Sequence, residues 1–135
     1  MRVLAIDYGD RRTGLAFSDA GGVLCGEAFT MEEWDAGRLA ERIASECRER
    51  DVGLIVLGLP RNMDGSEGPR AEKSRAFAEL LRERTGLEVR LWDERRSSVE
   101  AHAILSANGK REKKHKKNVD ALAAVLILES CLGTL

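Results

Sequence analysis

Aromatic side chains are scarce in this sequence of 135 residues, since two Trp, one Tyr and three Phe make up only 4% of it. Rings so few and scattered are not expected to form a base-stacking platform for a nucleic acid. Low-complexity tracts are absent too, and 43% of the residues are apolar and 33% charged. This composition excludes a disordered or collagen-like chain, and the length predicts a single domain over residues 1–135.

Cysteine and long apolar runs are also lacking. The three cysteines, Cys25, Cys47 and Cys131, are an odd number at wide spacing and match neither a disulfide framework nor a zinc pattern. No run approaches the 18 apolar residues of a membrane helix, and the first residues lack the features of a secretory signal. We therefore expect a cytoplasmic protein with reduced thiols and no membrane partner.

Short apolar runs alternate first with turn signals and then with helical periodicity. Five strands are predicted at residues 3–8, 14–18, 23–30, 54–57 and 89–92. Helices are predicted at 35–50, through 77–81 to about 86, from 97 to about 108, and at 119–132. The order indicates an α/β fold: a five-stranded mixed sheet with three antiparallel strands first and β-α-β units after them, and helices on both faces.

Acidic residues occur where acids are unfavourable, at the ends of two apolar strands and at the start of an apolar helix. These residues are Asp7, Asp93, Glu94 and Asp120. Each has an ordinary alternative explanation. Asp7 could form a turn, and Asp93 or Glu94 could be surface charges. Asp120 could simply be an acid at the start of a helix, where the helix dipole stabilises a negative charge. Because strand ends and a helix start can converge at one edge of a sheet, we expect the acids to form one site.

A group of carboxylates without His or Cys neighbours is an all-oxygen site, which selects Mg²⁺ or Mn²⁺ over zinc. Two such ions about 3.5–4 Å apart can activate a water and stabilise the leaving oxygen of an in-line displacement at a phosphodiester. The acids therefore predict phosphoryl transfer or hydrolysis.

Basic residues lie close to the acids in the sequence. In residues 110–117, six are Lys or Arg and one is Glu, so this run carries +5, while the net charge of −1 leaves −6 for the remainder. Such a run could be a solvated loop, and arginines beside acids could merely pair with them. Their position favours contacts to a nucleic-acid backbone. The expected nucleic-acid-binding residues are Arg11, Arg12, Arg95, Lys110, Arg111, Lys113, Lys114, Lys116 and Lys117.

Four blocks of sequence resemble the YqgF/RuvX family of Holliday-junction resolvases, also described as pre-16S ribosomal RNA nucleases, which has an RNase H-like fold. The blocks are D-Y-G-D-R-R-T-G at 7–14, G-L-P-R-N-M-D-G at 58–65, D-E-R at 93–95 and K-N-V-D-A-L-A-A at 117–124. The resemblance implies a metal-dependent nuclease whose acids map onto Asp7, Glu94 and Asp120, with Asp93 an additional or alternative ligand. Two threonines usually follow the third block, and Ser97 and Ser98 stand there in this chain.

The leading hypothesis is an endonuclease that cuts structured nucleic acid through two divalent ions, acting on pre-16S rRNA, on four-way DNA junctions, or on both. The alternative is a ribosome-assembly or RNA-binding protein without cleavage activity. Residue types alone do not separate DNA from RNA, because backbone contacts carry little of that distinction. A junction resolvase would work best as a two-fold dimer, since two sites must face two scissile bonds, but the sequence does not display an interface.

Overall fold

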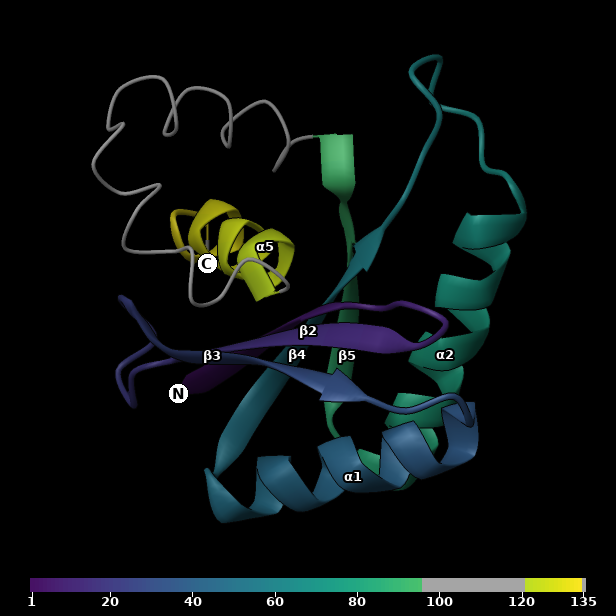
Figure 1. The fold of residues 1–135 in the computed structure, drawn as a ribbon. Helices are drawn as coiled ribbons and strands as arrows, with labels where there is room; N and C mark the ends of the chain where they lie inside the picture. Colours follow the sequence, from purple (N-terminus) through teal and green to yellow (C-terminus); the bar gives the residue numbers. More distant parts are fainter. Residues whose placement is uncertain (96–120, 135) are drawn as a thin grey trace.

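Five strands form one mixed sheet with the order β3-β2-β1-β4-β5 (Figure 1). The structure is a computed structural model that describes residues 1–95 and 121–134. The strands are β1 (Arg2–Asp7), β2 (Arg12–Ser18), β3 (Cys25–Glu32), β4 (Val52–Leu59) and β5 (Glu88–Asp93).

The first three strands form the expected antiparallel meander, and β4 and β5 then join the sheet in parallel with β1. Strand β4 lies between β1 and β5, as its uninterrupted apolar run predicted. Residues of such a central strand are covered on both faces, and Leu54 to Leu59 are all buried. The predicted α/β sheet with helices on both faces is confirmed.

Helices α1 (Ala36–Glu49) and α2 (Pro69–Thr85) cover one face of the sheet, and α5 (Leu122–Leu132) covers the other (Figure 1). Helix α1 begins after Asp35, whose Oδ1 accepts a hydrogen bond from the Arg38 amide at 3.1 Å. Helix α2 ends at Thr85 and is capped by Gly86, which has a left-handed φ of 69°. The helix predicted from residue 97 to about 108 lies outside the described residues.

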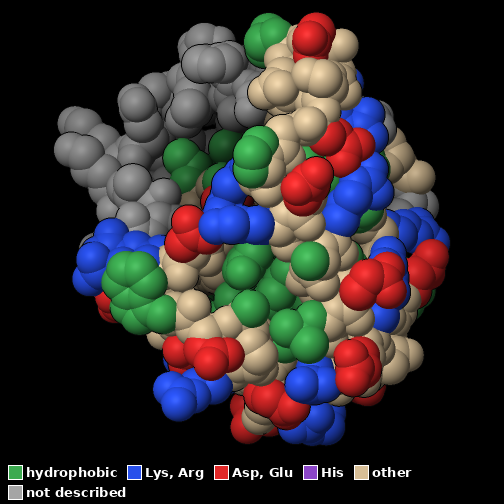
Figure 2. All heavy atoms as spheres, turned by 90° about the vertical axis from the view of Figure 1, so that its right-hand side faces the viewer, with side chains coloured by type: hydrophobic (Ala, Val, Ile, Leu, Met, Phe, Trp, Pro, Cys, Tyr) green, Lys and Arg blue, Asp and Glu red, His purple; other side chains and the backbone are tan. Residues whose placement is uncertain are grey.

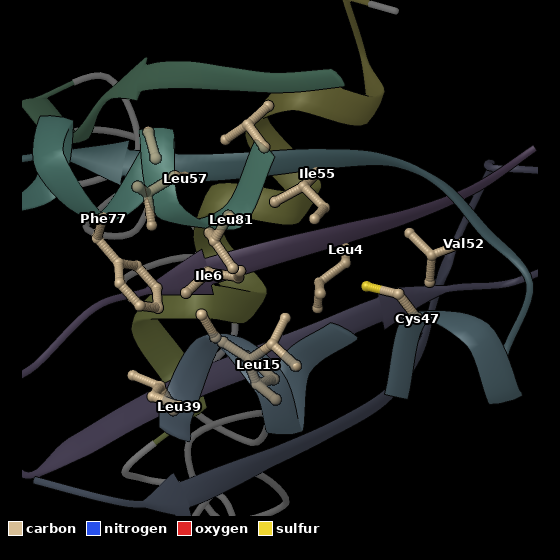
Figure 3. Close-up of a cluster of buried hydrophobic side chains, with 14 of the residues drawn as sticks. Leu4, Ile6, Leu15, Leu39, Cys47, Val52, Ile55, Leu57, Phe77 and Leu81 are labelled. Carbon is tan, nitrogen blue, oxygen red and sulfur yellow. The ribbon is translucent and has the colours of Figure 1, made fainter. Parts of the chain in front are cut away.

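The core has two parts because the side chains of each strand alternate between the two faces. Leu4 and Ile6 of β1 pack with α1 and α2, and Figure 3 shows this cluster around Leu57, Phe77 and Leu81. The residues that alternate with them on β1, Val3 and Ala5, pack with α5. Strand β1 is therefore held from both sides, and its carboxyl end has a fixed position.

The face on the side of α2 carries Lys and Arg side chains interspersed with Asp and Glu (Figure 2). Several of these charges form ion pairs, such as Arg75 with Glu67 at 2.6 Å. No single-sign patch dominates this view. Among the described residues, no helix combines the length and apolar character needed to cross a membrane.

Candidate active site

The carboxyl ends of β1, β4 and β5 meet at one edge of the sheet, because these three strands are parallel. The pairs Ile6–Leu57 and Leu59–Asp93 place these ends side by side. Asp7 is the last residue of β1, and Glu94 directly follows β5. This edge of a parallel sheet is where α/β folds place their sites.

Asp7 and Glu94 are brought into direct contact, with a hydrogen bond between their side chains. Such a bond between two carboxyl groups requires a proton on one of them. Burial and the neighbouring charge of Asp7 raise the pKa of Glu94 to about 7, and burial raises the pKa of Asp7 as well. The pair therefore concentrates negative charge in a partly desolvated place, where a cation can replace the shared proton.

Gly58 on β4 makes this meeting possible, since β4 separates the strands that carry the two acids. A Cβ atom at Gly58 would lie 2.6 Å from Oε1 of Glu94 and 2.8 Å from Cδ1 of Ile127 on α5. Both distances are below those of real contacts, so the Glu94 carboxyl group occupies the space that a side chain at residue 58 would take. The glycine of the second sequence block thus has a steric role within the site.

The turn after Asp7 is equally tight. A Cβ atom at Gly9 would overlap the carbonyl oxygen of Arg12. The Gly9 amide also donates a hydrogen bond to Oγ1 of Thr13, which is completely buried, at 3.3 Å. The first sequence block therefore forms a close-packed turn that fixes the Asp7 backbone.

Arg70, in the first turn of α2, is a site residue that sequence reasoning missed. Its Nη2 donates to the Tyr8 carbonyl oxygen at 2.5 Å, and its Nη1 donates to Oδ1 of Asp10 at 2.9 Å. Its charge also lowers the pKa of both Asp7 and Glu94, against the effect of burial. In sequence, Arg70 is one arginine among many on a charged helix and lies 60 to 62 residues from the turn residues it holds, so no local signal marks it.

Asp93 is engaged differently from Glu94. Its Oδ2 accepts a hydrogen bond from Nη2 of Arg95 at 2.6 Å, and this ion pair lowers the pKa of Asp93. Arg95 also reaches the Met63 carbonyl oxygen at 3.5 Å, in the connection between β4 and α2. Figure 1 shows this connection extending beyond the sheet at the edge where β5 ends. A metal-binding role for Asp93 stays a prediction.

The remaining predicted residues divide into two groups. Arg12 is the first residue of β2 and Arg11 directly precedes it. Nε of Arg11 donates to Oε1 of Glu32 at 2.8 Å. Asp120 and the basic residues 110–117 lie outside the described residues. Within residues 1–95 and 121–134, no group of three or more potential metal ligands occurs, so the described part of the site is the Asp7–Glu94 pair.

Comparison with known proteins identifies the family to which this chain belongs. The profile of a family described as "RuvX: Holliday junction resolvase" matches residues 1–134. The chain belongs to the RuvX family. The enzyme class expected from the sequence, a nuclease, is confirmed by this membership and by the names of its relatives.

Two curated relatives illustrate the similarity. A protein of Pelotomaculum thermopropionicum is 42% identical over 135 residues, covering 99% of this chain and 88% of that protein. A protein of Halalkalibacterium halodurans is 42% identical over 134 residues, covering 98% of this chain and 96% of that protein. Both are named "Putative pre-16S rRNA nuclease".

Solved structures confirm the fold of this RuvX chain. RuvC of Thermus thermophilus, solved with a Holliday-junction substrate, matches with a TM-score of 0.65 at 14% identity and covers 99% of this chain and 97% of RuvC. The Fowlpox virus resolvase, solved with Holliday-junction DNA, matches with a TM-score of 0.59 at 12% identity, covering 99% and 98%. At these identities the likeness concerns the architecture alone.

Proposed function

We propose that this chain is a divalent-metal-dependent endonuclease that hydrolyses phosphodiester bonds in structured nucleic acid, with residues 1–135 acting as one nuclease domain. The observation that carries the proposal is the contact between Asp7 and Glu94 at the carboxyl edge of the sheet. Without a bound cation, two partly buried acids in contact must share a proton, and such a pair is poorly stable. Their arrangement is explained when a cation takes the place of that proton.

The donor set fits Mg²⁺ or Mn²⁺. Only carboxylate oxygens are offered by Asp7 and Glu94, and hard cations prefer oxygen ligands. In the proposal Asp7, Glu94 and Asp120 hold the ions, with Asp93 as a further candidate ligand. When bound, a pair of such ions activates a water and stabilises the leaving oxygen of an in-line displacement.

The residues of the chain supply position and charge around this chemistry. Gly58 leaves room for the Glu94 carboxyl group, and the tight turn at Gly9 fixes Asp7. Arg70 anchors the same turn and favours the ionised form of both acids, which is the form that binds cations. These contacts preorganise the carboxylates before substrate arrives.

The substrate is a structured nucleic acid, either precursor 16S rRNA, which the names of the relatives support, or a four-way DNA junction, which the family description supports. Arg11, Arg12, Arg95 and the basic run 110–117 are proposed to neutralise backbone phosphates. A homodimer would suit a four-way junction, since it presents two sites to two strands.

The test compares cleavage of matched precursor-rRNA and four-way DNA substrates with Mg²⁺ or Mn²⁺, using the wild-type chain, Asp7→Asn and Asp120→Asn. We expect metal-dependent cleavage by the wild type and a loss of about 10³-fold or more in both variants. Mn²⁺ binding, measured by calorimetry, should weaken in parallel. Full activity of both variants would overturn the mechanism.

The alternative is a ribosome-assembly or RNA-binding protein in which the acids bind metal only structurally. It is favoured if RNA binding is salt-dependent while no substrate is cut under any metal condition. The same experiment therefore separates the two functions.

A further inference from the structure

Trp34 is an unusual surface residue, because 72% of this large aromatic side chain is exposed. It lies in the short connection between β3 and α1. The other tryptophan, Trp92, is half-buried and packs against the core on the side of α5. Trp34 therefore contributes little to the core, and its ring is open to a partner.

Trp34 lies at the same edge of the sheet as the Asp7–Glu94 pair. Strand β1 ends at this edge, β2 begins there, and β3 ends there, as the pairs Asp7–Gly14 and Arg12–Glu32 show. Strands β1 and β3 are two strand spacings, or roughly 10 Å, apart. Trp34 also lies four residues beyond Thr30, which is level with Asp7, and this adds up to roughly 13 Å along the strand direction. A nucleic-acid strand whose phosphate lies at the carboxylates passes over this distance within a few nucleotides.

The backbone around Trp34 is held firmly. Oε2 of Glu33 accepts hydrogen bonds from the amides of Trp34 and Asp35, at 3.1 and 3.2 Å. The Glu33 amide donates to the Arg11 carbonyl oxygen at 2.9 Å, which ties the segment to the β1–β2 turn. The next residue, Asp35, caps α1. A ring on such an ordered corner loses little conformational entropy when it binds a flat ligand.

Arg11 extends this surface. Its guanidinium carbon is 5.7 Å from the centre of the Trp34 ring, and its side chain is half exposed. Of the residues that the structure describes, only Glu32 accepts a hydrogen bond from this side chain. The nearby acids are engaged as well, because Glu32 pairs with Arg11 and Glu33 with Arg42. A ring beside a guanidinium offers stacking for a base and a positive charge for its phosphate.

We propose that Trp34 and Arg11 form a stacking platform for one unpaired nucleobase of the nucleic acid that is held at the Asp7–Glu94 pair. The inference rests on the proposed function and adds a binding site to it. It revises the expectation drawn from the scarcity of aromatics in the sequence, since a single exposed ring can hold one base although it cannot hold a row of them. The platform selects substrates that carry an unpaired base close to the scissile bond.

The test measures binding in EDTA, where no divalent ion supports cleavage. A fluorescent single-stranded oligonucleotide and a blunt duplex of the same sequence are titrated with the wild type and three variants. Trp34→Ala should weaken single-strand binding about 5- to 150-fold, the range that corresponds to the loss of one stacked base. Trp34→Phe should retain most of the affinity, and Trp34→Leu, which keeps apolar area without a ring, should not.

Two controls make the result specific. Duplex affinity should change less than about twofold in every variant, and thermal unfolding should not change because Trp34 is exposed. In oligonucleotides that lack one base, the effect of Trp34→Ala should disappear only when the missing base is the one that stacks on Trp34. Equal losses for duplex and single strand, or a single-strand loss below twofold, would overturn the platform.

The outcomes separate this inference from the proposed function. If the wild type cleaves nucleic acid with Mg²⁺ while Trp34→Ala binds normally, the function stands and the platform is wrong. If single strands bind through Trp34 but no substrate is ever cut, the platform stands and the nuclease proposal is wrong.

Discussion

The side chains of Asp7 and Glu94 are hydrogen-bonded to each other across strand β4, at the position where Gly58 has no side chain. Strands β1 and β5 are not neighbours, so their acids meet only because the strand between them offers room. The glycine of the block at 58–65 therefore makes room for the contact between the acids of the blocks at 7–14 and 93–95.

The first prediction concerns this room. Gly58→Ala should abolish metal binding and cleavage, because its Cβ atom would displace the Glu94 carboxyl group. It should also destabilise the fold by about 1–3 kcal/mol through the clash with Ile127. The double variant Gly58→Ala/Ile127→Val removes the methyl group that clashes. We expect the double variant to recover thermal stability but not Mn²⁺ affinity in calorimetry.

The control for that pair is Ile127→Val alone, which should bind Mn²⁺ like the wild type and lose about 0.5–1.5 kcal/mol of stability. If the double variant regains both stability and Mn²⁺ affinity, Gly58 acts on packing only and its role in positioning Glu94 is wrong.

The second prediction is a dependence of stability on pH without metal. Because the pKa of Glu94 is about 7 in the fold against 4.5 for an ordinary glutamate, the folded chain binds more protons than the unfolded chain between these values. The contribution of Glu94 to the free energy of unfolding should be fully present below about pH 4.5 and be lost as pH rises through 7, whereas acids with a lowered pKa, such as Asp93, lose their contribution at low pH. Urea unfolding in EDTA at several pH values measures this slope.

A matched comparison assigns the slope to the correct acid. Glu94→Gln keeps a donor for Asp7 but does not titrate, so it should remove most of the loss between pH 4.5 and 7. Asp93→Asn changes the neighbouring acid, whose pKa is lowered by Arg95. The contribution of Asp93 to the free energy of unfolding is lost at low pH, so the slope near neutral pH should persist in Asp93→Asn. An unchanged slope in Glu94→Gln would contradict the assignment.

The sequence predicts most of this architecture because strands and helices are encoded locally. The apolar run at 54–57 has no charged residue, as expected for a strand covered on both faces, and β4 occupies that central place. Two apolar faces along β1 likewise required layers on both sides of the sheet. Element boundaries shifted by a few residues; β3, for example, ends at Glu32 and not at Thr30.

The site was only partly predictable, since its contacts depend on distance in space. The sequence identified Asp7 and, through the family resemblance, Glu94, with Asp93 as an additional or alternative ligand. Only the three-dimensional arrangement shows that Glu94 reaches Asp7 while Asp93 pairs with Arg95. The role of Arg70 depends on how α2 packs against the β1–β2 turn, which no local pattern encodes.

The third prediction separates stability from function at Asp7. In EDTA at pH 8, Asp7→Asn should raise the melting temperature, because it removes one of two partly desolvated like charges. Mg²⁺ should stabilise the wild type by about 2.7 kcal/mol at one hundred times its Kd and leave the variant unchanged. Thermal unfolding with and without Mg²⁺ measures both effects. Equal stabilisation of the two proteins by Mg²⁺ would place the metal elsewhere.

The last prediction concerns Arg70 as a positioning residue. Arg70→Ala loses two hydrogen bonds to the turn after Asp7 and a positive charge near both acids. We expect kcat to fall about tenfold, or about 1.4 kcal/mol, and the acidic limb of the pH–activity profile to move to higher pH. Arg70→Lys keeps the charge but cannot form the two-pronged contact, so it should restore the pH profile and not the rate. Lys73→Ala is the control, since Lys73 touches only Asp10 in this turn, at 3.2 Å, and should leave both the rate and the profile nearly unchanged. If Arg70→Lys restores the rate fully, the charge alone matters and the anchoring of the turn does not.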